Sequence, residues 1–435
     1  MTRFLFVLML LITMNIDEAS AQNQRTLSVD ELFSLLEQNS KALRSQKTGI
    51  TASEIGISVA KSQRLPDVST SFSASYIGNV LLTDRNFSNV HGLHSPHFGN
   101  NFALEAQQVV YAGGAINAGI RMAELQNEQV GLATDMTRQQ LRFIAIGQYL
   151  ELAKLTNRET VLESNITLTQ KLIDDINAKH TQGVALKNDV TRYELQMQAL
   201  NLNLTELRNQ RNILNHQLCN TLGITGISII PDKTVENGTF PQEGENVWQT
   251  DAISSSQTIK MSDVKKEIAE TNLKLAKSEI RPKVAVVAAD NFDGPITFEL
   301  PPIDKNLNVW YVGIGIKYSI SSLFKNNKKI NQAEITSRQA SEAREVAAEQ
   351  LNNDIQQAYT LYQQSYIELQ TQQKKVQLAN ENYDVINDRY LNQLSLVTDM
   401  LDASNMKLDA ELSEADAKIN IAYAYYKLKF IAGTL

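Results

Sequence analysis

Residues Asn308 to Ile320 read NVWYVGIGIKYSI, and their alternation decides which kind of element they form. Every second residue from Trp310 to Ile320 is bulky and apolar or aromatic, whereas the residues between them include two glycines, a lysine and a serine. A period of two is typical of a strand. An apolar face with aromatic residues near its ends, backed by a small and polar face, is typical of a membrane-barrel strand. Taken alone, the stretch suits a strand of a soluble β-sandwich equally well.

The order of the elements around this stretch decides between the two interpretations. A second alternating stretch runs over residues 68–76, and further strands are expected at about 101–110 and 283–290. Pro66 and Pro282 stand at the same kind of junction, between a helix and a strand, and lie 216 residues apart. Each half of the chain is predicted to run helix, proline, strand, loop, strand, long helices. This order indicates an internal duplication.

The remaining sequence predicts very long helices. No proline occurs between Pro96 and Pro231, or from Ile303 to the end, and proline is what breaks helix interiors. Within these regions apolar residues recur at steps of three, four and seven, which is typical of coiled-coil packing. A helix from Gly114 to Gln182 would be about 100 Å long. The apolar positions are Tyr193, Met197, Leu200, Leu204, Leu207, Leu214 and Leu218, then Leu401, Leu408, Leu412, Ala415, Ile419, Ala422 and Tyr426.

The N-terminus predicts export from the cytoplasm. Residues 1–21 combine Arg3, an eleven-residue apolar run and the small residues Ala19-Ser20-Ala21, which together indicate a secretory signal peptide. The only cysteine is Cys219, so no disulfide framework is expected. The net charge of −7 is spread along the chain, which argues against nucleic-acid binding. No apolar run reaches 18 residues, so if the chain meets a membrane, it is expected to do so through strands.

The number of strands predicts an oligomer. A chain with four strands cannot close a barrel, for which about eight strands are the working minimum. An open sheet in lipid would leave backbone groups without hydrogen-bond partners. Three copies would supply twelve strands, an even number that encloses a water-filled lumen. We therefore predict a homotrimer whose strands come from all three chains.

Two stretches at the ends of the long helices carry a family resemblance. Residues 182–190 (QGVALKNDV) place a glycine six residues before an Asp-Val pair, and residues 393–402 (QLSLVTDMLD) repeat the pattern 210 residues later with Gln393 in the glycine position. The closing residues 430–435 (FIAGTL) are similar in kind. Together with the duplicated plan, these stretches resemble the outer membrane efflux protein (TolC) family over essentially the whole mature chain.

The resemblance implies a mixed α and β fold: a twelve-stranded outer membrane β-barrel, four strands from each chain of the trimer, continued by a periplasmic α-helical coiled-coil tunnel. It divides the chain into a signal peptide (1–21), a first repeat (22–222, strands about 67–110), an equatorial insertion (223–258) that is loop-like in sequence, and a second repeat (259–435, strands about 283–320).

The resemblance also assigns roles to residues at the two helix tips. Asp399 and Asp402 match the pattern of acids that line the narrow periplasmic aperture in the relatives, where rings of carboxylates favour cations. Asp189 and Tyr390 match a network that holds this end closed. The family's arginine in that network is replaced by Ser395, so we expect another cation in its place or a weaker closed state, with Arg389, Lys187 and Arg192 as candidates. Contact with a periplasmic adaptor is expected at Gly183, Val184, Ala185, Leu186, Leu394, Ser395, Leu396 and Val397.

The implied function is passive export. The trimer would give an exit through the outer membrane of a Gram-negative bacterium to substrates that an inner-membrane pump delivers through the adaptor, with outer membrane lipid around the barrel. No catalytic residue or cofactor is expected, because no Ser-His-Asp set or glycine-rich phosphate loop occurs. The alternative is a periplasmic or surface coiled-coil scaffold or adhesin without a pore. It would explain the heptads but neither the alternating strands nor the tip motifs.

The sequence HGLHSPH places His91, His94 and His97 in the segment between the first two predicted strands. Neutral imidazoles at this spacing could capture Zn²⁺ or Cu²⁺. A solvated loop on the exterior side of the barrel explains the same residues, and we take that as the interpretation, with metal capture as the alternative.

Overall fold

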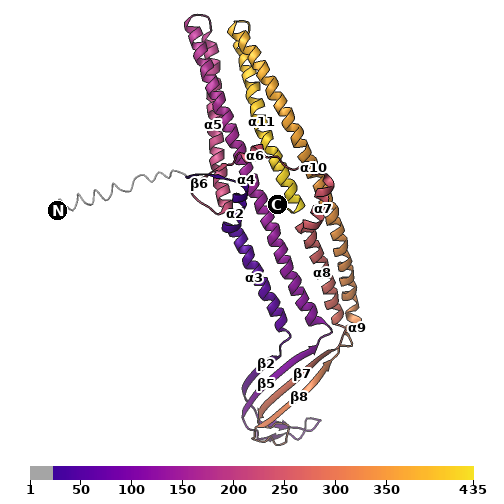
Figure 1. The fold of residues 1–435 in the computed structure, drawn as a ribbon. Coiled ribbons are helices and arrows are strands. Elements are labelled where there is room, and N and C mark those ends of the chain that lie inside the picture. Colours follow the sequence, from indigo (N-terminus) through magenta and orange to yellow (C-terminus); the bar gives the residue numbers. More distant parts are fainter. Residues whose placement is uncertain (1–22) are drawn as a thin grey trace, which may run out of the picture. The chain divides into compact units, whose positions relative to one another are not determined.

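The computed structural model describes residues 23–435, so the expected signal peptide at residues 1–21 lies outside the described range. Figure 1 shows the elements of the chain, coloured along the sequence. The chain divides into two compact units. The described part of the first comprises residues 23–47, 133–259 and 347–435, and the second comprises residues 48–132 and 260–346. The long helices α4 (Ala115–Thr181) and α10 (Asn327–Leu391) contribute residues to both units.

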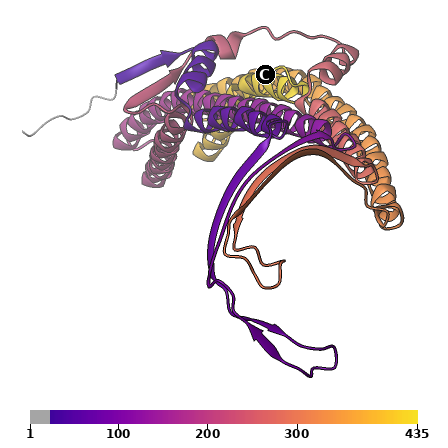
Figure 2. The same ribbon diagram turned by 90° about the horizontal axis from the view of Figure 1, so that it is seen from below.

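The second unit contains a four-stranded antiparallel sheet, in the order β2-β5-β7-β8, whose strands follow curved paths (Figure 2). Its strands are β2 (Asp67–Tyr76), β5 (Phe98–Tyr111), β7 (Lys283–Gly294) and β8 (Leu307–Lys317). All four were predicted, but β8 ends three residues before Ile320, because the chain turns there into the short helix α9 (Ser322–Lys325). Strands β2 and β8 are the edges of this sheet.

The register of the sheet separates an apolar face from a small and polar one. Phe72 pairs with Phe102, which pairs with Phe292, so three aromatic rings stand in one row across three strands. On the same face, Trp310 and Ile314 of β8 are 71% and 73% exposed. Bulky apolar side chains at this exposure lack a covering layer, as the alternation in the sequence predicts for a face turned towards lipid.

The first unit contains two helix hairpins, α4–α5 and α10–α11, where α5 is Lys187–Leu222 and α11 is Val397–Ala432. The predicted apolar series on α5 is buried throughout, except at Leu214, which is half-buried. Arg211, the one interruption of that series, forms an ion pair with Glu159 of α4. None of the described helices is both long enough and apolar enough to cross a membrane.

The lengths of the helices confirm the internal duplication. Helices α2 (Val29–Asn39) and α7 (Glu245–Ser255) each have 11 residues, and α3 (Lys41–Ser62) and α8 (Gln257–Ser278) each have 22. The two copies of the final helix, α5 and α11, each have 36 residues and end at a glycine in the left-handed region, with φ of 69° and 77°. Each half of the chain therefore has two shorter helices, then two long helices, and ends at the same glycine cap.

The segment 223–258 is more structured than predicted. It contains β6 (Ile227–Pro231), α6 (Thr234–Asn237) and α7. Strand β6 pairs in parallel with β1 (Asn23–Leu27), and the buried Tyr149 hydroxyl joins the two segments by donating to the Leu27 carbonyl at 2.5 Å and accepting from the Asp232 N–H at 2.8 Å. The expectation of a loop was wrong because these short elements depend on partners outside the segment, among them Tyr149, more than 80 residues before Asp232 in the chain.

Candidate functional site at the helix tips

Both hairpins reverse direction through the same backbone turn. At the first tip Gly183 has φ of 77°, and the next N–H, of Val184, donates to the Lys179 carbonyl at 2.9 Å. At the second tip Gln393 has φ of 61°, and the next N–H makes the equivalent bond at 2.8 Å. This pattern is a Schellman cap, which needs one left-handed residue. The prediction that Gln393 occupies the glycine position is confirmed, at a conformational cost of about 1–2 kcal/mol for a residue with a side chain.

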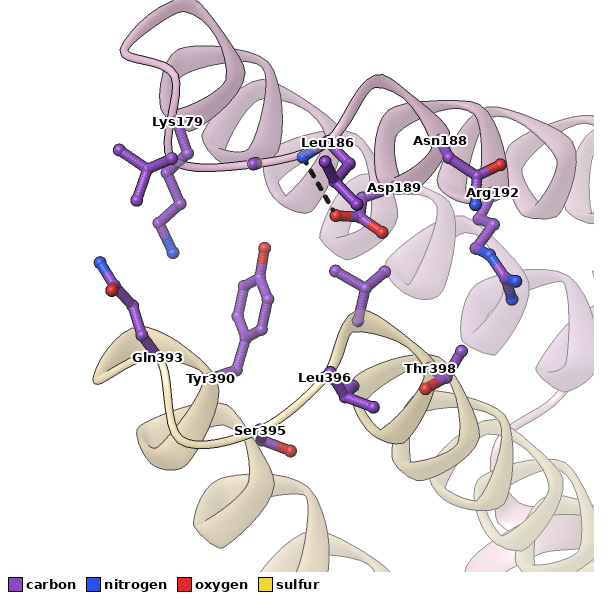
Figure 3. A pocket seen from close by; sticks show the side chains of 13 residues that line it. Lys179, Leu186, Asn188, Asp189, Arg192, Tyr390, Gln393, Ser395, Leu396 and Thr398 are labelled. Atoms are coloured by element: carbon purple, nitrogen blue, oxygen red, sulfur yellow. Dashed lines mark hydrogen bonds between the residues drawn. The ribbon is translucent and has the colours of Figure 1, made fainter.

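Two of the acids singled out by the sequence cap the helices that follow these turns. The Asp189 carboxylate accepts from the Leu186 N–H at 3.2 Å (Figure 3). The Asp399 carboxylate accepts from the Leu396 N–H at 3.0 Å and from the Ser395 hydroxyl at 2.9 Å. A negative charge in the first helical turn also interacts favourably with the helix dipole. These bonds to the charged form hold the pKa of Asp399 below its usual value.

Tyr390 lies between the two tips and contacts a cation from the other hairpin. The Lys179 ammonium stands 4.4 Å from the centre of the Tyr390 ring (Figure 3). The tyrosine is only 8% exposed, and its burial, helped by the negative charge of Asp189, raises its pKa. The neutral ring therefore presents its face to the ammonium, an attraction worth about 0.5–2 kcal/mol depending on desolvation.

Lys179 was not among the cations considered from the sequence. Ser395 bonds to Asp399 of its own hairpin, and Arg389 donates to the Leu394 carbonyl at 3.4 Å, also within its own hairpin. Arg192 lines the same cleft as Tyr390. From the sequence, a cation was expected near the position of the missing arginine or at the start of α5, whereas Lys179 comes from the last turn of α4, on the opposite hairpin. Only the packing of the hairpins brings it to Tyr390.

A cleft of about 320 Å³ opens beside this contact, between the two tips. Below it the hairpins share an apolar cluster that includes Tyr193, Tyr383 and Met400. Tyr193 is 1% exposed, its hydroxyl has no hydrogen-bond partner within residues 23–435, and burial raises its pKa. The residues around the cleft are Lys179, Val184, Ala185, Leu186, Asn188, Asp189, Arg192, Tyr390, Gln393, Ser395, Leu396, Val397 and Thr398.

Six of the eight residues expected to contact an adaptor line this cleft, and Gly183 and Leu394 are adjacent to lining residues in the chain, but the eight differ in exposure. Leu186, Leu394 and Leu396 are 70%, 68% and 69% exposed, and Val184 is also exposed. Val397, in contrast, is buried in the apolar cluster. The tips thus present a small group of leucines to solvent, supported by buried neighbours. Gly183 shapes the turn, while Ala185 and Ser395 are half-buried.

The two predicted aperture residues lie on one side of α11. Asp399 and Asp402 are three positions apart and exposed, whereas Met400 and Ala403 between and beside them are buried. Residues three apart on a helix are neighbours on its surface. Asp399 is engaged as a cap, and Asp402 is the more distant of the two from the turn.

The three histidines are only partly brought together. A short hairpin of β3 (Val80–Leu82) and β4 (His91–Leu93) occupies the segment predicted as a loop, and His91 pairs with Leu82 in it. His97 donates from Nδ1 to the Ile77 carbonyl at 2.8 Å, and its ring centre lies 5.4 Å from that of His94. Over residues 23–435 no three His, Cys, Asp or Glu side chains are grouped so that they could hold a metal ion.

Comparison with known proteins agrees with this architecture. The sequence model of the family described as outer membrane efflux protein matches residues 248–434. The outer membrane protein VceC from Vibrio cholerae is 15% identical, with a TM-score of 0.75 over 93% of this chain and 96% of that one. The Campylobacter jejuni outer membrane channel CmeC is 13% identical, with a TM-score of 0.74 over 93% and 85%. CusC, whose structures are described in connection with transmembrane channel formation, is 13% identical, with a TM-score of 0.78 over 93% of this chain and 92% of that one. No curated protein sequence matches the chain.

The chain therefore shares the fold of these outer membrane proteins, mixed α and β and built from two repeats. Its resemblance to the outer membrane efflux protein family, first seen in the tip motifs and the duplicated plan, is confirmed. The family model covers mainly the second repeat, whereas the structural similarity extends over both.

Proposed function

We propose that three copies of this chain form an outer membrane efflux channel. The observation that carries the proposal is the curved four-stranded sheet with two edge strands, β2 and β8, and an exposed apolar face. Backbone groups at a sheet edge need partners inside a bilayer, and closing the sheet with two further copies provides them. The similarity to VceC and CmeC, both outer membrane proteins by description, supports the same location for this chain.

In this proposal the chain is a passive duct. An inner-membrane pump supplies the energy and a periplasmic adaptor joins the pump to the helix tips, so the chain needs no catalytic group of its own. The exposed leucines Leu186, Leu394 and Leu396 offer apolar contacts that an adaptor can cover. We assign the adaptor contact to these residues with Val184, Ala185 and Ser395, on turns shaped by Gly183 and Gln393 and supported by the buried Val397.

We further propose that the tips form the gate. Tyr390 and Asp189 belong to it as the resemblance implies, and Lys179 takes the role of the missing arginine by holding the Tyr390 ring across the two hairpins. In the trimer, Asp399 and Asp402 would form two rings of carboxylates at the aperture, which favour cations. Separation of the hairpins would break the contact between Lys179 and Tyr390 and widen the opening.

Extraction from membranes tests the channel against the alternative of a scaffold or adhesin. A barrel trimer should leave the outer membrane only with detergent and should migrate differently before and after boiling. A scaffold without a pore would be released without detergent and would show no such difference. Release of the full-length chain by salt or buffer alone would exclude the proposed channel.

Conductance in planar bilayers tests the gate. Replacing Lys179 with Met should raise the conductance of the closed trimer, because loss of about 0.5–1 kcal/mol per chain changes the closed population severalfold. The matched control is Lys171→Met, on an exposed residue of the same helix. Asp189→Asn should act in the same direction as Lys179→Met. A closed-state conductance unchanged in both Lys179→Met and Asp189→Asn would contradict the assignment.

A further inference from the structure

Two lysines face each other across neighbouring strands of the sheet. Lys283 of β7 pairs with Lys317 of β8, and both side chains are exposed. Directly opposite residues have Cβ atoms about 4.5–5.5 Å apart, a spacing at which like charges destabilise the sheet. Neither ammonium has a hydrogen bond or ion pair with any residue in 23–435. A repulsive pair without a compensating partner points to a ligand of opposite charge.

The two lysines line a hollow of about 490 Å³ at the end of the sheet where β7 begins and β8 ends. Arg281 and Glu279 line it as well, but Glu279 is engaged, with its carboxylate accepting from Lys329 at 2.5 Å and from Asn326 at 3.2 Å. One Arg281 nitrogen donates to a backbone carbonyl at 3.0 Å, which fixes the guanidinium in place. Three cations thus share the hollow with one acid that is already neutralised.

The other acids on this face of the sheet lie too far away to pair with the lysines. Asp67 of β2 is in register, through Gln107 of β5, with Val287 of β7. It therefore lies two strands from Lys283 across the sheet, and two same-face residues from it along the strand direction. Glu105 belongs to the row of Ala289, one row farther. With about 6.7 Å between rows on one face and 4.8 Å between strands, both carboxylates are more than about 15 Å from Lys283. At physiological salt, exposed charges at this distance are largely screened.

The opposite face of the same strands bears the apolar residues. Val284 follows Lys283 in the chain and Ile316 precedes Lys317. These two residues pair with each other, and Ile316 is 71% exposed. In the proposed channel this apolar face is turned to lipid, so the lysine face is turned to the lumen. This step rests on the proposed function.

We propose that Lys283, Lys317 and Arg281 form an anion-binding collar in the lumen, at the end of the sheet where it meets the helices. The ligands are the anionic groups of passing solutes, a carboxylate, sulfonate or phosphate, held by the lysine ammonium groups and the free N–H groups of the arginine. Three chains would place three such sites around one lumen. The collar carries the opposite charge to the acids at the helix tips, so it would attract cargo anions, whereas the acids favour cations.

The ion selectivity of the reconstituted trimer tests the collar. Reversal potentials in a KCl gradient give the ratio of chloride to potassium permeability, and block by inorganic tripolyphosphate probes binding of a larger anion. The double variant Lys283→Gln, Lys317→Gln should lower the permeability ratio about threefold and weaken the block by a similar factor, as expected for solvent-exposed ion pairs. Lys283→Arg, Lys317→Arg should keep both properties.

The control is Lys325→Gln, Lys328→Gln, which removes the same charge from exposed residues that do not line the hollow. This variant should behave as the wild type. If channels form but the glutamine variant matches the wild type in selectivity and block, the collar is overturned and the proposed channel stands. If no chain forms a heat-modifiable trimer or a conducting channel, the proposed function itself fails.

Discussion

Replacing Gly183 with Ala should loosen the first helix tip by a predictable amount. At φ of 77° the residue is in the left-handed region, and a Cβ added there would meet no atom within 4 Å, so the backbone conformation alone sets the cost. That cost is about 1–2 kcal/mol, and the stiffer unfolded chain of alanine offsets about 0.4–1 kcal/mol of it. The net loss is about 1 kcal/mol, or about fivefold in the opening equilibrium.

Hydrogen exchange of peptides covering residues 178–186 measures this loss, because tips open locally without unfolding of the whole trimer. Gly131→Ala is the control. This glycine lies inside α4 with no atom within 4 Å of an added Cβ and with ordinary helical backbone, so alanine there should stabilise the helix by about 0.5–1 kcal/mol. Exchange at the tip that is unchanged or slower in Gly183→Ala would refute the left-handed geometry of this turn.

Two further changes test other parts of the first unit. Tyr149→Phe removes the hydroxyl that joins β1 to the residue after β6. The change should cost about 2 kcal/mol because a buried carbonyl and a partly buried N–H lose their partner. Exchange in residues 227–232 should rise about thirtyfold, whereas Tyr423→Phe, on a 41% exposed ring, should leave it unchanged. Because the pKa of Asp399 is lower in the folded chain, its cap is complete above the unfolded value of about 4 and is lost as the pH falls through the folded value. Protection of residues 394–400, corrected for intrinsic exchange, should therefore drop in acid, and Asp399→Asn should show no such step.

The sequence predicted what depends on periodicity and on single residues with strong backbone preferences. The alternation in β8 gave the strand and its faces, and the absence of proline gave α4 within a residue or two of its ends. Gln393 was placed in the glycine position of a turn, and it adopts the left-handed backbone. Each of these properties is encoded locally, in neighbours along the chain.

What the sequence did not predict depends on contacts between distant segments. Strand β6 has no alternation long enough to detect and forms because β1 lies beside it. Helix α7, with 11 residues, carries too few turns for a clear period, although its buried Trp248 packs into an apolar cluster with α10 and α11. The contact between Lys179 and Tyr390 joins residues 211 positions apart. Tertiary packing alone creates such pairs.

Because Asp399 caps helix α11, Asp402 is the better residue to mutate in a test of the proposed aperture. Replacing Asp399 removes a charge from the proposed ring and also weakens the hydrogen bonds that start α11, so a changed conductance would have two explanations. Asp402 makes no hydrogen bond or ion pair within residues 23–435 and is exposed, so Asp402→Asn alters the charge alone. We expect this variant to reduce cation selectivity and block by multivalent cations while exchange at the tip stays as in the wild type. Unchanged selectivity would place Asp402 outside the aperture, whatever Asp399→Asn does.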